Sequence, residues 1–404
     1  MTARAPTDAC SPTSCDGIVA WAGVDWWYHP HGHSECQLMS RLARRVPVLW
    51  VNSIGMRAPT PGKTQMLLQR YAWKLKSTFQ GLRQDASGMW VYSPVFVPRY
   101  TPRVLELNGR LLAMQIGRLC RRLGIRRPST FVTVPTVAPA LRHRKWTSIV
   151  FNRCDDFAAF PEADASLISG LEQRIFDAAD HVVYVNDYLF QRERDHVNDA
   201  RYLGHGVDYE HFARSRASGN GRRGPTAIRD LPRPIVGFYG SIEDYRVDLE
   251  LLIKVARHIA PGTLLLIGPK TMDISRLEAE PNVTYLGPLP HDQLPAYAVE
   301  FDVGLMPFTQ NEFTANINPI KLKEYLALGF PIVATKFPAI TPYAELVHVA
   351  DSPDEFTSKV DAALHENDVA MIEKRRHAVA GDSWDALAER VAELLCVEPE
   401  SRRS

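Results

Sequence analysis

Apolar runs bounded by glycine, proline and polar residues alternate along most of this chain with segments of helical periodicity. In the first half, strands are predicted at residues 18–22, 46–52, 89–92, 130–134, 148–152 and 181–186, with helices at about 36–45, 103–123 and 165–179. In the second half, the apolar segments PIVGFYG, TLLLIGP, VTYLG and VGLMPF recur with short helices between them. Because this alternation is typical of doubly wound parallel sheets, we predict an α/β protein with two Rossmann-like domains.

The segment NINPIKLKEYLALGFPIVAT, residues 316–335, carries the clearest local pattern. A helix is predicted from Lys321 to Leu328, and Gly329 has the position of its C-cap. In an open α/β sheet, ligands bind outside the carboxyl ends of the strands, where the first turn of such a helix presents backbone N–H groups. With Lys321 near the start of the helix and Glu324 three residues beyond it, this segment suits a phosphate and a polyol.

Length and composition narrow the class of protein. At 404 residues the chain exceeds the size of one typical core, which favours two domains. No apolar run is long enough to predict a membrane span, and the N-terminal residues MTARAPTDACSPTSCDG lack the apolar stretch of a signal peptide. Residues 1–16 are polar and small, and we expect them to be disordered. The six cysteines have no metal-site spacing, which favours a reduced cytoplasmic protein over a disulfide or zinc protein.

The net charge of +1 hides an uneven distribution. Residues 57–145 contain 17 Lys and Arg against two acids, a local excess of +15. Within them, TQMLLQRYAWKLKSTFQGLR has the pattern of an amphipathic cationic helix with Leu68, Ala72, Leu75 and Phe79 on its apolar face. The predicted helix at 103–123 is also basic.

Three interpretations fit these basic helices. Cationic amphipathic helices bind anionic bilayers, and each basic residue near such a surface contributes about 1 kcal/mol. Ordinary packing of the apolar faces on a core, with solvated charges, is favoured by the pattern, but it does not account for the missing acids. A nucleic-acid patch is less favoured, because no recognition motif accompanies the charge. We therefore predict peripheral association with the inner face of a membrane and no nucleic-acid partner.

The segment 316–335 resembles the nucleotide-sugar site of retaining glycosyltransferases with the GT-B fold, of the large family 4 type. Those enzymes carry two glutamates separated by seven residues, of which the first holds the donor sugar and the second holds the ribose. Glu324 matches the second glutamate, whereas Asn316 stands at the position of the first. This departure recurs in a subgroup of exopolysaccharide and teichuronic-acid transferases, whose characteristic run resembles NPIKLKEYLALGFPIVAT.

The resemblance implies two domains that face each other across a cleft. An acceptor-binding domain is expected at residues 17–212, after the disordered tail at 1–16. A linker at 213–234 is expected to lead to a nucleotide-sugar-binding domain at 235–380. The segment 381–404 is expected to carry a final helix that crosses back to the N-terminal domain.

The resemblance also implies which residues bind the donor. The turn after the strand of PIVGFYG is expected to hold the diphosphate, and the ends of the next two strands are expected to surround the base. The predicted donor residues are Gly240, Ser241, Gly268, Pro269, Tyr285, Leu286, Asn316, Asn318, Pro319, Ile320, Lys321 and Glu324. The family usually has an arginine and a lysine after the diphosphate turn, and both are absent here. Lys321 and Arg246 are therefore expected to neutralise the leaving group.

Residues of the N-terminal half are expected to face the acceptor and the reacting centre. The acceptor-binding candidates are Gly23, Trp26, Trp27, His33 and His205. The tryptophans are equally compatible with filling the domain core, and the histidines with solvation. Asp155 and Asp156 follow a strand end and are catalytic candidates together with Lys321 and Arg246, although adjacent acids are also typical of a helix N-cap.

These expectations describe one reaction. The chain is expected to move a sugar from a nucleotide-diphosphate donor to a hydroxyl of a lipid-linked or polysaccharide precursor, with retention and without an obligatory metal or other cofactor. Two alternatives stay open: a nucleotide-sugar epimerase of the same fold, and a catalytically silent subunit of a polysaccharide assembly complex. The basic helices argue against the epimerase, whereas Asn316 and the missing basic pair leave room for the silent subunit.

Overall fold

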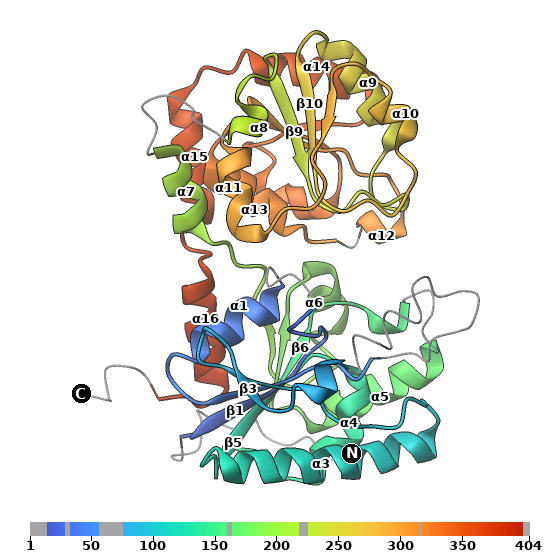
Figure 1. Ribbon diagram of the computed structural model, residues 1–404, viewed down its shortest axis with the longest axis vertical. Coiled ribbons are helices and arrows are strands. Elements are labelled where there is room, and N and C mark those ends of the chain that lie inside the picture. The colour runs from blue at the N-terminus through green and yellow to red at the C-terminus, as the bar shows by residue number, and fades with distance from the viewer. Residues whose placement is uncertain are drawn as a thin grey trace. The chain divides into compact units, whose positions relative to one another are not determined.

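The computed structural model describes residues 14–28, 33–55, 76–159, 164–217, 225–315 and 317–398. These residues form two compact units, each built on a mainly parallel sheet (Figure 1). Unit 1 runs to Gly204 and takes up the chain again from Asp385, whereas unit 2 runs from His205 to Trp384. The prediction of two doubly wound α/β domains is confirmed.

Unit 1 has an eight-stranded sheet in the order β3-β4-β2-β1-β5-β6-β7-β8. Its strands are β1 (Gly17–Trp21), β2 (Val48–Val51), β3 (Arg83–Gln84), β4 (Trp90–Tyr92), β5 (Pro128–Val132), β6 (Ile149–Arg153), β7 (His181–Tyr184) and β8 (Ala200–Tyr202). Only the β3–β4 pair is antiparallel. All residues of β1, β2 and β5 are buried, as expected for strands covered on both faces. The strand order reverses between β1 and β5.

The helices of unit 1 cover the two faces of this sheet. They are α1 (Ser34–Leu42), α3 (Pro102–Arg122), α4 (Ala138–Leu141), α5 (Ala165–Ala178), α6 (Asp187–Glu193) and most of α16 (Trp384–Leu394), with short 3-10 turns at Pro135–Val137 and Phe157–Ala159. Helices α3, α4 and α5 pack together. The helix α16 lies beside α1, because Arg41 of α1 pairs with Asp385 of α16 at 3.1 Å, and its end is held by the hydroxyl of Ser129, which donates to Leu395 O at 2.6 Å.

Unit 2 has a six-stranded, fully parallel sheet in the order β11-β10-β9-β12-β13-β14. Its strands are β9 (Ile235–Tyr239), β10 (Thr263–Ile267), β11 (Val283–Tyr285), β12 (Val303–Met306), β13 (Ile332–Thr335) and β14 (His348–Ala350). The order is that of a dinucleotide-binding fold, with a reversal between β9 and β12. One buried core cluster extends through the whole unit.

The helices of unit 2 form two layers. They are α7 (Tyr209–Ala217), α8 (Thr226–Arg229), α9 (Leu249–Ile259), α10 (Ser275–Glu278), α11 (Leu294–Ala298), α12 (Glu312–Ala315), α13 (Ile320–Leu328), α14 (Pro353–Leu364) and α15 (Val369–Ala380), with 3-10 turns at His291–Gln293 and Pro338–Tyr343. Helix α9 packs on α10 and α14, whereas α13 packs on α7 and α15. Gly329 ends α13 with φ 78°, the left-handed conformation expected of its C-cap.

The boundary between the units differs from the expected one. The division falls between Gly204 and His205, and the segment predicted as a linker at 213–234 belongs to unit 2. This segment carries the end of α7 and all of α8, and Ile228 is fully buried in the core of unit 2. The chain enters unit 2 early because Val207 forms a bridge with Ser383, a contact between residues far apart in the sequence.

The cysteines also differ from expectation at one position. Cys15, Cys36, Cys120 and Cys154 are free, but Cys396 is disulfide-bonded. The backbone N–H of Cys15 donates to Cys396 O at 2.9 Å, so the segment that ends unit 1 lies against the segment that begins it. Spacing along the sequence carries no signal for such a long-range approach.

The basic amphipathic segment expected around Leu68, Ala72 and Leu75 lies outside the described residues, which resume at residue 76. The second basic helix is present as α3, close to its expected bounds. In the part of the chain that the structure describes, no helix combines the length and the apolar character that crossing a bilayer requires.

Candidate functional site

The loops after β9 and β12 meet where the strand order of unit 2 reverses, which is where doubly wound sheets bind ligands. Two backbone hydrogen bonds join these loops. The N–H of Asp248 donates to Pro307 O at 2.9 Å, and the N–H of Thr309 donates to Arg246 O at 2.9 Å. Most of the predicted donor residues follow β9, β10 and β11 or begin α13, so they lie at the carboxyl ends of these strands.

Two glycine turns form the floor of this site. Gly240 has φ 141° and Gly268 has φ 138°, and both values favour glycine over any residue with a side chain. A Cβ atom on Gly268 would collide with the carbonyl oxygen of Gly240, and a Cβ atom on Gly240 would collide with Cε of Lys321. The turns after β9 and β10 are therefore in direct contact, and the side chain of Lys321 lies across the first of them.

Lys321 comes from the first turn of α13, whose N-cap is Pro319. This N-cap makes no side-chain hydrogen bond to the backbone of the helix. Burial lowers the pKa of the Lys321 ammonium, and the nearby charge of Arg246 lowers it further, while Glu324 and Glu243 act in the opposite direction. An ammonium beside a helix N-terminus and a glycine turn is an arrangement that suits a phosphate group.

Arg246 lies in the loop after β9 and is held on several sides. Its Nε is 3.4 Å from Oε2 of Glu243, and its guanidinium carbon lies 5.3 Å from the ring centroid of Phe313. Lys321 lies across the Gly240 turn, which begins the loop that carries Arg246, and the charge of Arg246 lowers the Lys321 pKa, so the two cations predicted to neutralise the leaving group lie at the same loop. The hydroxyl of Thr309 and the amide of Asn311 both donate to Tyr245 O, at 2.9 and 2.7 Å, which fixes this loop.

The Glu324 carboxylate is buried rather than open to solvent. Its side chain is 3% exposed, and its oxygens lie 2.8 Å from the hydroxyl of Tyr239 and 2.8 Å from Nε2 of His291. Burial opposes protonation of His291, but the hydrogen bond and the charge of Glu324 raise the His291 pKa above its usual value. His291 is the more open partner, with 25% of its side chain exposed. The contact between Glu324 and the ribose stays a prediction. In the structure, Glu324 belongs to a hydrogen-bonded group with Tyr239 and His291.

The residues predicted around the base form a second wall. The hydroxyl of Tyr285 donates to Gly268 O at 2.8 Å, and the ammonium of Lys270 lies 4.7 Å from the centroid of the Tyr285 ring. Pro269 O accepts a bond from the N–H of Ile242, and the N–H of Leu286 donates to Leu266 O. Ser241, Asn318 and Ile320 are half-buried at the same end of the sheet. Asn316 lies outside the described residues, so its role in holding the donor sugar stays a prediction.

Unit 1 also has hydrogen-bonded residues where its own strand order reverses, after β1. Gly23 follows β1, and its N–H donates to both carboxylate oxygens of Glu35, at 3.0 and 3.1 Å, while the N–H of Val24 donates at 3.2 Å. Burial raises the pKa of Glu35 to about 7 against the effect of these hydrogen bonds, and the negative charge of Asp155 adds to the rise. Glu35 therefore fixes the loop that carries the acceptor candidates and lies near Asp155.

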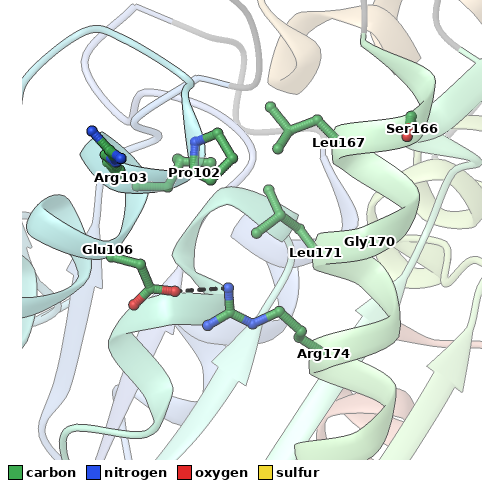
Figure 2. Close-up of a pocket in the computed structure, with 9 residues that line it drawn as sticks. Pro102, Arg103, Glu106, Ser166, Leu167, Gly170, Leu171 and Arg174 are labelled. Carbon is green, nitrogen blue, oxygen red and sulfur yellow. Dashed lines mark ion pairs between the residues drawn. The ribbon is translucent and has the colours of Figure 1, made fainter.

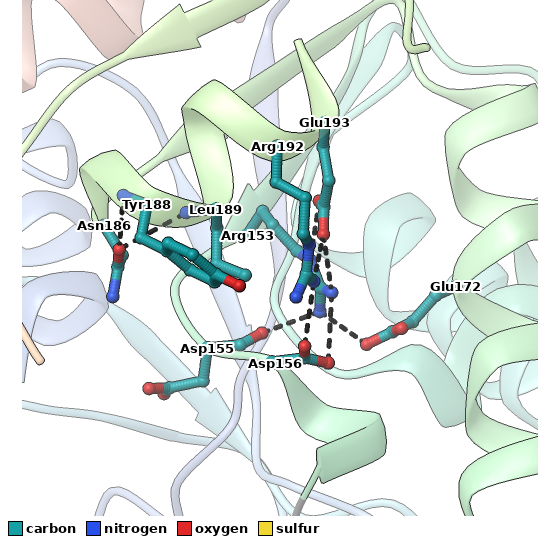
Figure 3. A network of polar contacts seen from close by, with 9 residues as sticks. All are labelled: Arg153, Asp155, Asp156, Glu172, Asn186, Tyr188, Leu189, Arg192 and Glu193. Atoms are coloured by element: carbon teal, nitrogen blue, oxygen red, sulfur yellow. Dashed lines mark hydrogen bonds and ion pairs between the residues drawn. The ribbon is translucent and has the colours of Figure 1, made fainter. Parts of the chain in front are cut away.

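Asp155 and Asp156 follow β6 but differ in their surroundings. Asp155 is exposed, and its carboxylate interacts with the Cys154 thiol. Asp156 accepts a bond from Arg192 at 2.8 Å and pairs with Arg153 at 3.4 Å; although burial opposes ionisation, these arginines lower the Asp156 pKa. Figure 3 shows the Asp156 carboxylate turned toward this cluster and that of Asp155 pointing away from it. Asp156 belongs to an ion-pair network, whereas the Asp155 side chain is exposed, and the catalytic roles of both acids stay predictions.

The acceptor candidates are also separated by the structure. Trp26 is 5% exposed, packs edge-on against Trp50 with centroids 5.2 Å apart, and donates its backbone N–H to Asn52 at 2.8 Å. The prediction that Trp26 stacks on a sugar is therefore wrong, and it fills the core instead. Trp27 is half-buried, His33 is exposed, and His205 is half-buried in unit 2, where its carbonyl accepts a bond from Lys323 at 2.6 Å.

The groove shown in Figure 2 is not part of this site. It has a volume of about 470 Å³ and lies between α3 and α5, where Glu106 and Arg174 form an ion pair at 2.9 Å. Helix side chains line it, rather than the loops that follow the strands. Within the described ranges, no group of three or more His, Cys, Asp or Glu side chains has the arrangement of a metal site.

Several residues of the site were missed in the sequence. They are Tyr239, His291, Glu35 and Arg153, each of which touches or orients a predicted residue. Tyr239 and Arg153 both end buried strands, where a polar atom reaches the carboxyl edge of the sheet. That position is a usable signal. The pairing of His291 with Glu324 joins residues 33 positions apart and has no local signal.

Comparison with known proteins identifies several that are similar to this chain. Residues 233–366 match the family described as "Glycosyl transferases group 1". The chain is 27% identical over 275 residues to TuaH of Bacillus subtilis (strain 168), which is named as a teichuronic acid biosynthesis glycosyltransferase; the match covers 63% of this chain and 68% of TuaH.

Two solved structures share the whole fold. Sucrose-phosphate synthase from Thermosynechococcus elongatus superposes with a TM-score of 0.64 at 17% identity, covering 94% of this chain and 98% of that one. HepE from Anabaena, in complex with UDP and glucose, superposes with a TM-score of 0.64 at 13% identity, covering 94% and 99%. At these identities the likeness shows the fold.

Proposed function

Since this chain is a glycosyltransferase with the GT-B fold, we propose that it moves a sugar from a nucleotide-diphosphate donor bound by unit 2 to a hydroxyl of a cell-surface glycan precursor. The observation that carries the proposal is Lys321, which lies across the Gly240 turn at the strand reversal of unit 2. TuaH is named for teichuronic acid synthesis, and HepE was solved with UDP and glucose, which supports a glycan product and a nucleoside diphosphate ligand.

In this proposal, unit 2 binds the donor along one edge of its sheet. The diphosphate lies over Gly240 and Gly268, within reach of Lys321 and Arg246. The base lies toward Tyr285, and the ribose diol lies against the Tyr239–Glu324–His291 group. Charge on the departing diphosphate is stabilised by cations and helix amides that are already in place, so that little reorganisation accompanies bond breaking. We propose that these cations act without an obligatory metal and that the sugar is transferred with retention.

Unit 1 supplies the acceptor side of the proposal. Asp155 is exposed at the end of β6 and interacts with groups that follow β1. A carboxylate in that position orients an acceptor hydroxyl or faces the sugar cation that develops as the glycosidic bond breaks. Trp27 and His33 remain candidates for contacts to the acceptor.

The donor assignment is tested by ligand binding to the Glu324→Gln variant. A thermal-shift screen with UDP, GDP, ADP and their sugars first identifies the nucleotide, because a ligand that binds the folded state raises the apparent melting temperature. We then expect the variant to bind this nucleotide about 2 kcal/mol more weakly by calorimetry, roughly 30-fold in Kd, because a charge-assisted hydrogen bond is lost.

The matched control for this test is Glu300→Gln. Glu300 is also buried in unit 2 and pairs with Arg233 at 2.5 Å, but it precedes β12 and so lies at the amino end of the strands. Its replacement is expected to leave the nucleotide Kd unchanged. Equal nucleotide affinity in the wild type and the Glu324 variant would show that the Tyr239–Glu324–His291 group does not bind the ribose.

We also propose that unit 1 binds the inner face of a membrane and that the acceptor is lipid-linked. The exposed face of α3 carries Arg103, Leu107, Arg110, Met114, Arg118 and Arg121, which recur at helical spacing. Leu107 is 49% and Met114 is 46% exposed, whereas the opposite face is buried in the core. The neighbouring segment adds Val95, which is 61% exposed and whose N–H donates to Gln115 of α3. Alternating arginines and exposed apolar residues suit an anionic bilayer surface.

The exposed face of α3 together with Val95, which we call the docking face, predicts salt-dependent binding to vesicles. The wild type is expected to co-sediment with phosphatidylglycerol vesicles at low ionic strength and to be released at high ionic strength. The double variant Arg110→Gln/Arg118→Gln should bind about 30-fold more weakly, from about 1 kcal/mol for each arginine. The control is Arg257→Gln/Arg276→Gln, which removes two arginines of similar exposure from unit 2. Absence of binding at low salt, or an equal loss in the control, would remove the docking face from the proposal.

A further inference from the structure

Two aromatic side chains stand exposed beside the cations of the donor site. Tyr245, in the loop after β9, is 46% exposed, and Phe313, in α12, is 39% exposed. Their ring centroids are 4.9 Å apart and their planes are nearly perpendicular, at 87°. Aromatic rings of this size are usually buried, so a pair that stays partly exposed at a ligand-binding edge needs an explanation.

The pair is held in place by its surroundings. The guanidinium of Arg246 lies over the ring of Phe313 at 5.3 Å and over the ring of Tyr245 at 6.0 Å. Thr309 and Asn311 both donate to Tyr245 O. Asn311 and Thr314 also bond to each other, with Thr314 N–H donating to Asn311 Oδ1 at 2.9 Å. The loops that carry the two rings are therefore tied together before any ligand arrives, which lowers the entropic cost of binding.

The position of the pair limits what it can bind. Tyr245 and Arg246 lie in the loop that begins at the Gly240 turn, and Lys321 lies across this turn. A group bound against the rings is thus a neighbour of the diphosphate. The predicted base wall at Tyr285 follows β11, on the outer side of β10, whereas Phe313 follows β12, on the opposite side of β9. Because the proposed function assigns the base to Tyr285 and the ribose to the Tyr239–Glu324–His291 group, the part of the donor left for the rings is the sugar.

A pyranose ring has the chemistry that this pair can recognise. The C–H groups on one face of the ring form an apolar patch whose hydrogens carry partial positive charge, and the face of an aromatic ring is its negative region. An apolar segment of another protein suits the two rings less well than a sugar does. Arg246 and Lys321 border the rings, and such a segment would desolvate their charges without offering a counter-charge.

We propose that Phe313 and Tyr245 form a stacking platform for the ring of the transferred sugar. This inference rests on the proposed function, since it assigns the sugar part of the same donor. Phe313 supplies the stacking face, and Tyr245 supports it edge-on. The platform contributes to the affinity for the nucleotide-sugar but not to the affinity for the nucleoside diphosphate alone.

The test compares two ligands in each variant by calorimetry. The probes are UDP and UDP-glucose, followed by GDP and GDP-mannose if the first pair does not bind. Phe313→Ala is expected to weaken binding of the nucleotide-sugar roughly tenfold, with the Kd of the nucleoside diphosphate unchanged. Phe313→Leu keeps apolar volume without an aromatic face and should show most of this loss, whereas Phe313→Tyr should restore wild-type affinity. Val369→Ala, at an apolar residue of unit 2 that is 72% exposed, is the control and should change neither value.

The outcomes separate this inference from the proposed function. If the wild type binds none of the four probes, both fall together. If the nucleoside diphosphate binds but the Phe313 variants retain the full affinity for the nucleotide-sugar, the platform is refuted and the donor site stands. If Phe313→Ala weakens both ligands equally, the residue maintains the loop rather than contacting the sugar, and the platform is refuted as well.

Discussion

Lys321→Met is expected to reduce turnover of the nucleotide-sugar donor by about 100- to 1,000-fold while the protein remains folded. The loss corresponds to removing one preorganised donor from the site where charge develops, about 2.7 to 4 kcal/mol of transition-state stabilisation. Methionine keeps an unbranched side chain across the Gly240 turn, so the close packing that excludes a Cβ atom there is maintained. The measurement is the steady-state rate of release of the nucleoside diphosphate at saturating donor.

The pH dependence gives this prediction a second readout. Burial lowers the pKa of Lys321, so the ammonium loses its proton earlier on the alkaline side than an exposed lysine does. Wild-type turnover should therefore fall as the pH rises through this lowered pKa, and the variant should lack that limb. Lys254→Met is the control, because Lys254 lies on α9, is 38% exposed and pairs only with a surface acid, Asp354. Wild-type turnover in Lys321→Met would mean that the diphosphate is neutralised elsewhere.

The segment around Lys321 was predictable because its signals are local. Adjacent residues predicted a helix from Lys321 to Leu328 with Gly329 as its C-cap. The structure places α13 at Ile320–Leu328, with Gly329 in the left-handed region. The glycines after β9 and β10 also end apolar segments, but their roles as donor residues came from the resemblance to the glycosyltransferases. What the sequence did not contain is that the two turns touch and that Lys321 crosses one of them, because this depends on the packing of three separate segments.

The errors arose where side-chain direction is set by distant partners. For Trp26 the sequence left an acceptor contact and a place in the core open, and its contacts with Trp50 and Asn52 place it in the core. Asp155 and Asp156 are adjacent in the sequence and were given the same role. They separate because Arg153 and Arg192 bind the Asp156 carboxylate, while the Asp155 carboxylate points away from this cluster (Figure 3). No periodicity along β6 encodes that choice.

The unit boundary was misplaced for a related reason. Residues 213–234 are rich in glycine, proline and arginine, which is typical of a linker. The structure buries Ile228 in unit 2 and pairs Val207 with Ser383, so the division precedes this segment. Composition describes how flexible a segment is by itself, whereas a boundary depends on which core the flanking residues join.

Arg153→Met is expected to destabilise unit 1 by about 3 to 5 kcal/mol, the cost of leaving buried carboxylates without their counter-ion. Arg153 is 2% exposed at the end of β6, and Figure 3 shows it surrounded by acids. Its guanidinium donates to Glu172 at 2.5 Å and to Glu193 at 3.1 and 3.2 Å, and it also holds the carbonyl of Asp155 at 2.7 Å. Although burial opposes its charge, these acids raise the pKa of Arg153.

Urea unfolding of the variant, followed by circular dichroism, measures this loss of stability. The direction in which the loss changes with pH can also be predicted. Burial raises the pKa of Glu172 to about 7 even though Arg153 opposes this rise. Removing Arg153 raises the Glu172 pKa further above that of the unfolded chain, so the variant loses more stability than the wild type as the pH rises. Adding Glu172→Gln should recover part of the loss, because it removes one of the unpaired charges. Arg192→Met is the control: its side chain is 41% exposed, and the loss there should stay below about 1 kcal/mol. If Arg153→Met and Arg192→Met cost the same, the buried network contributes no more to stability than a surface ion pair.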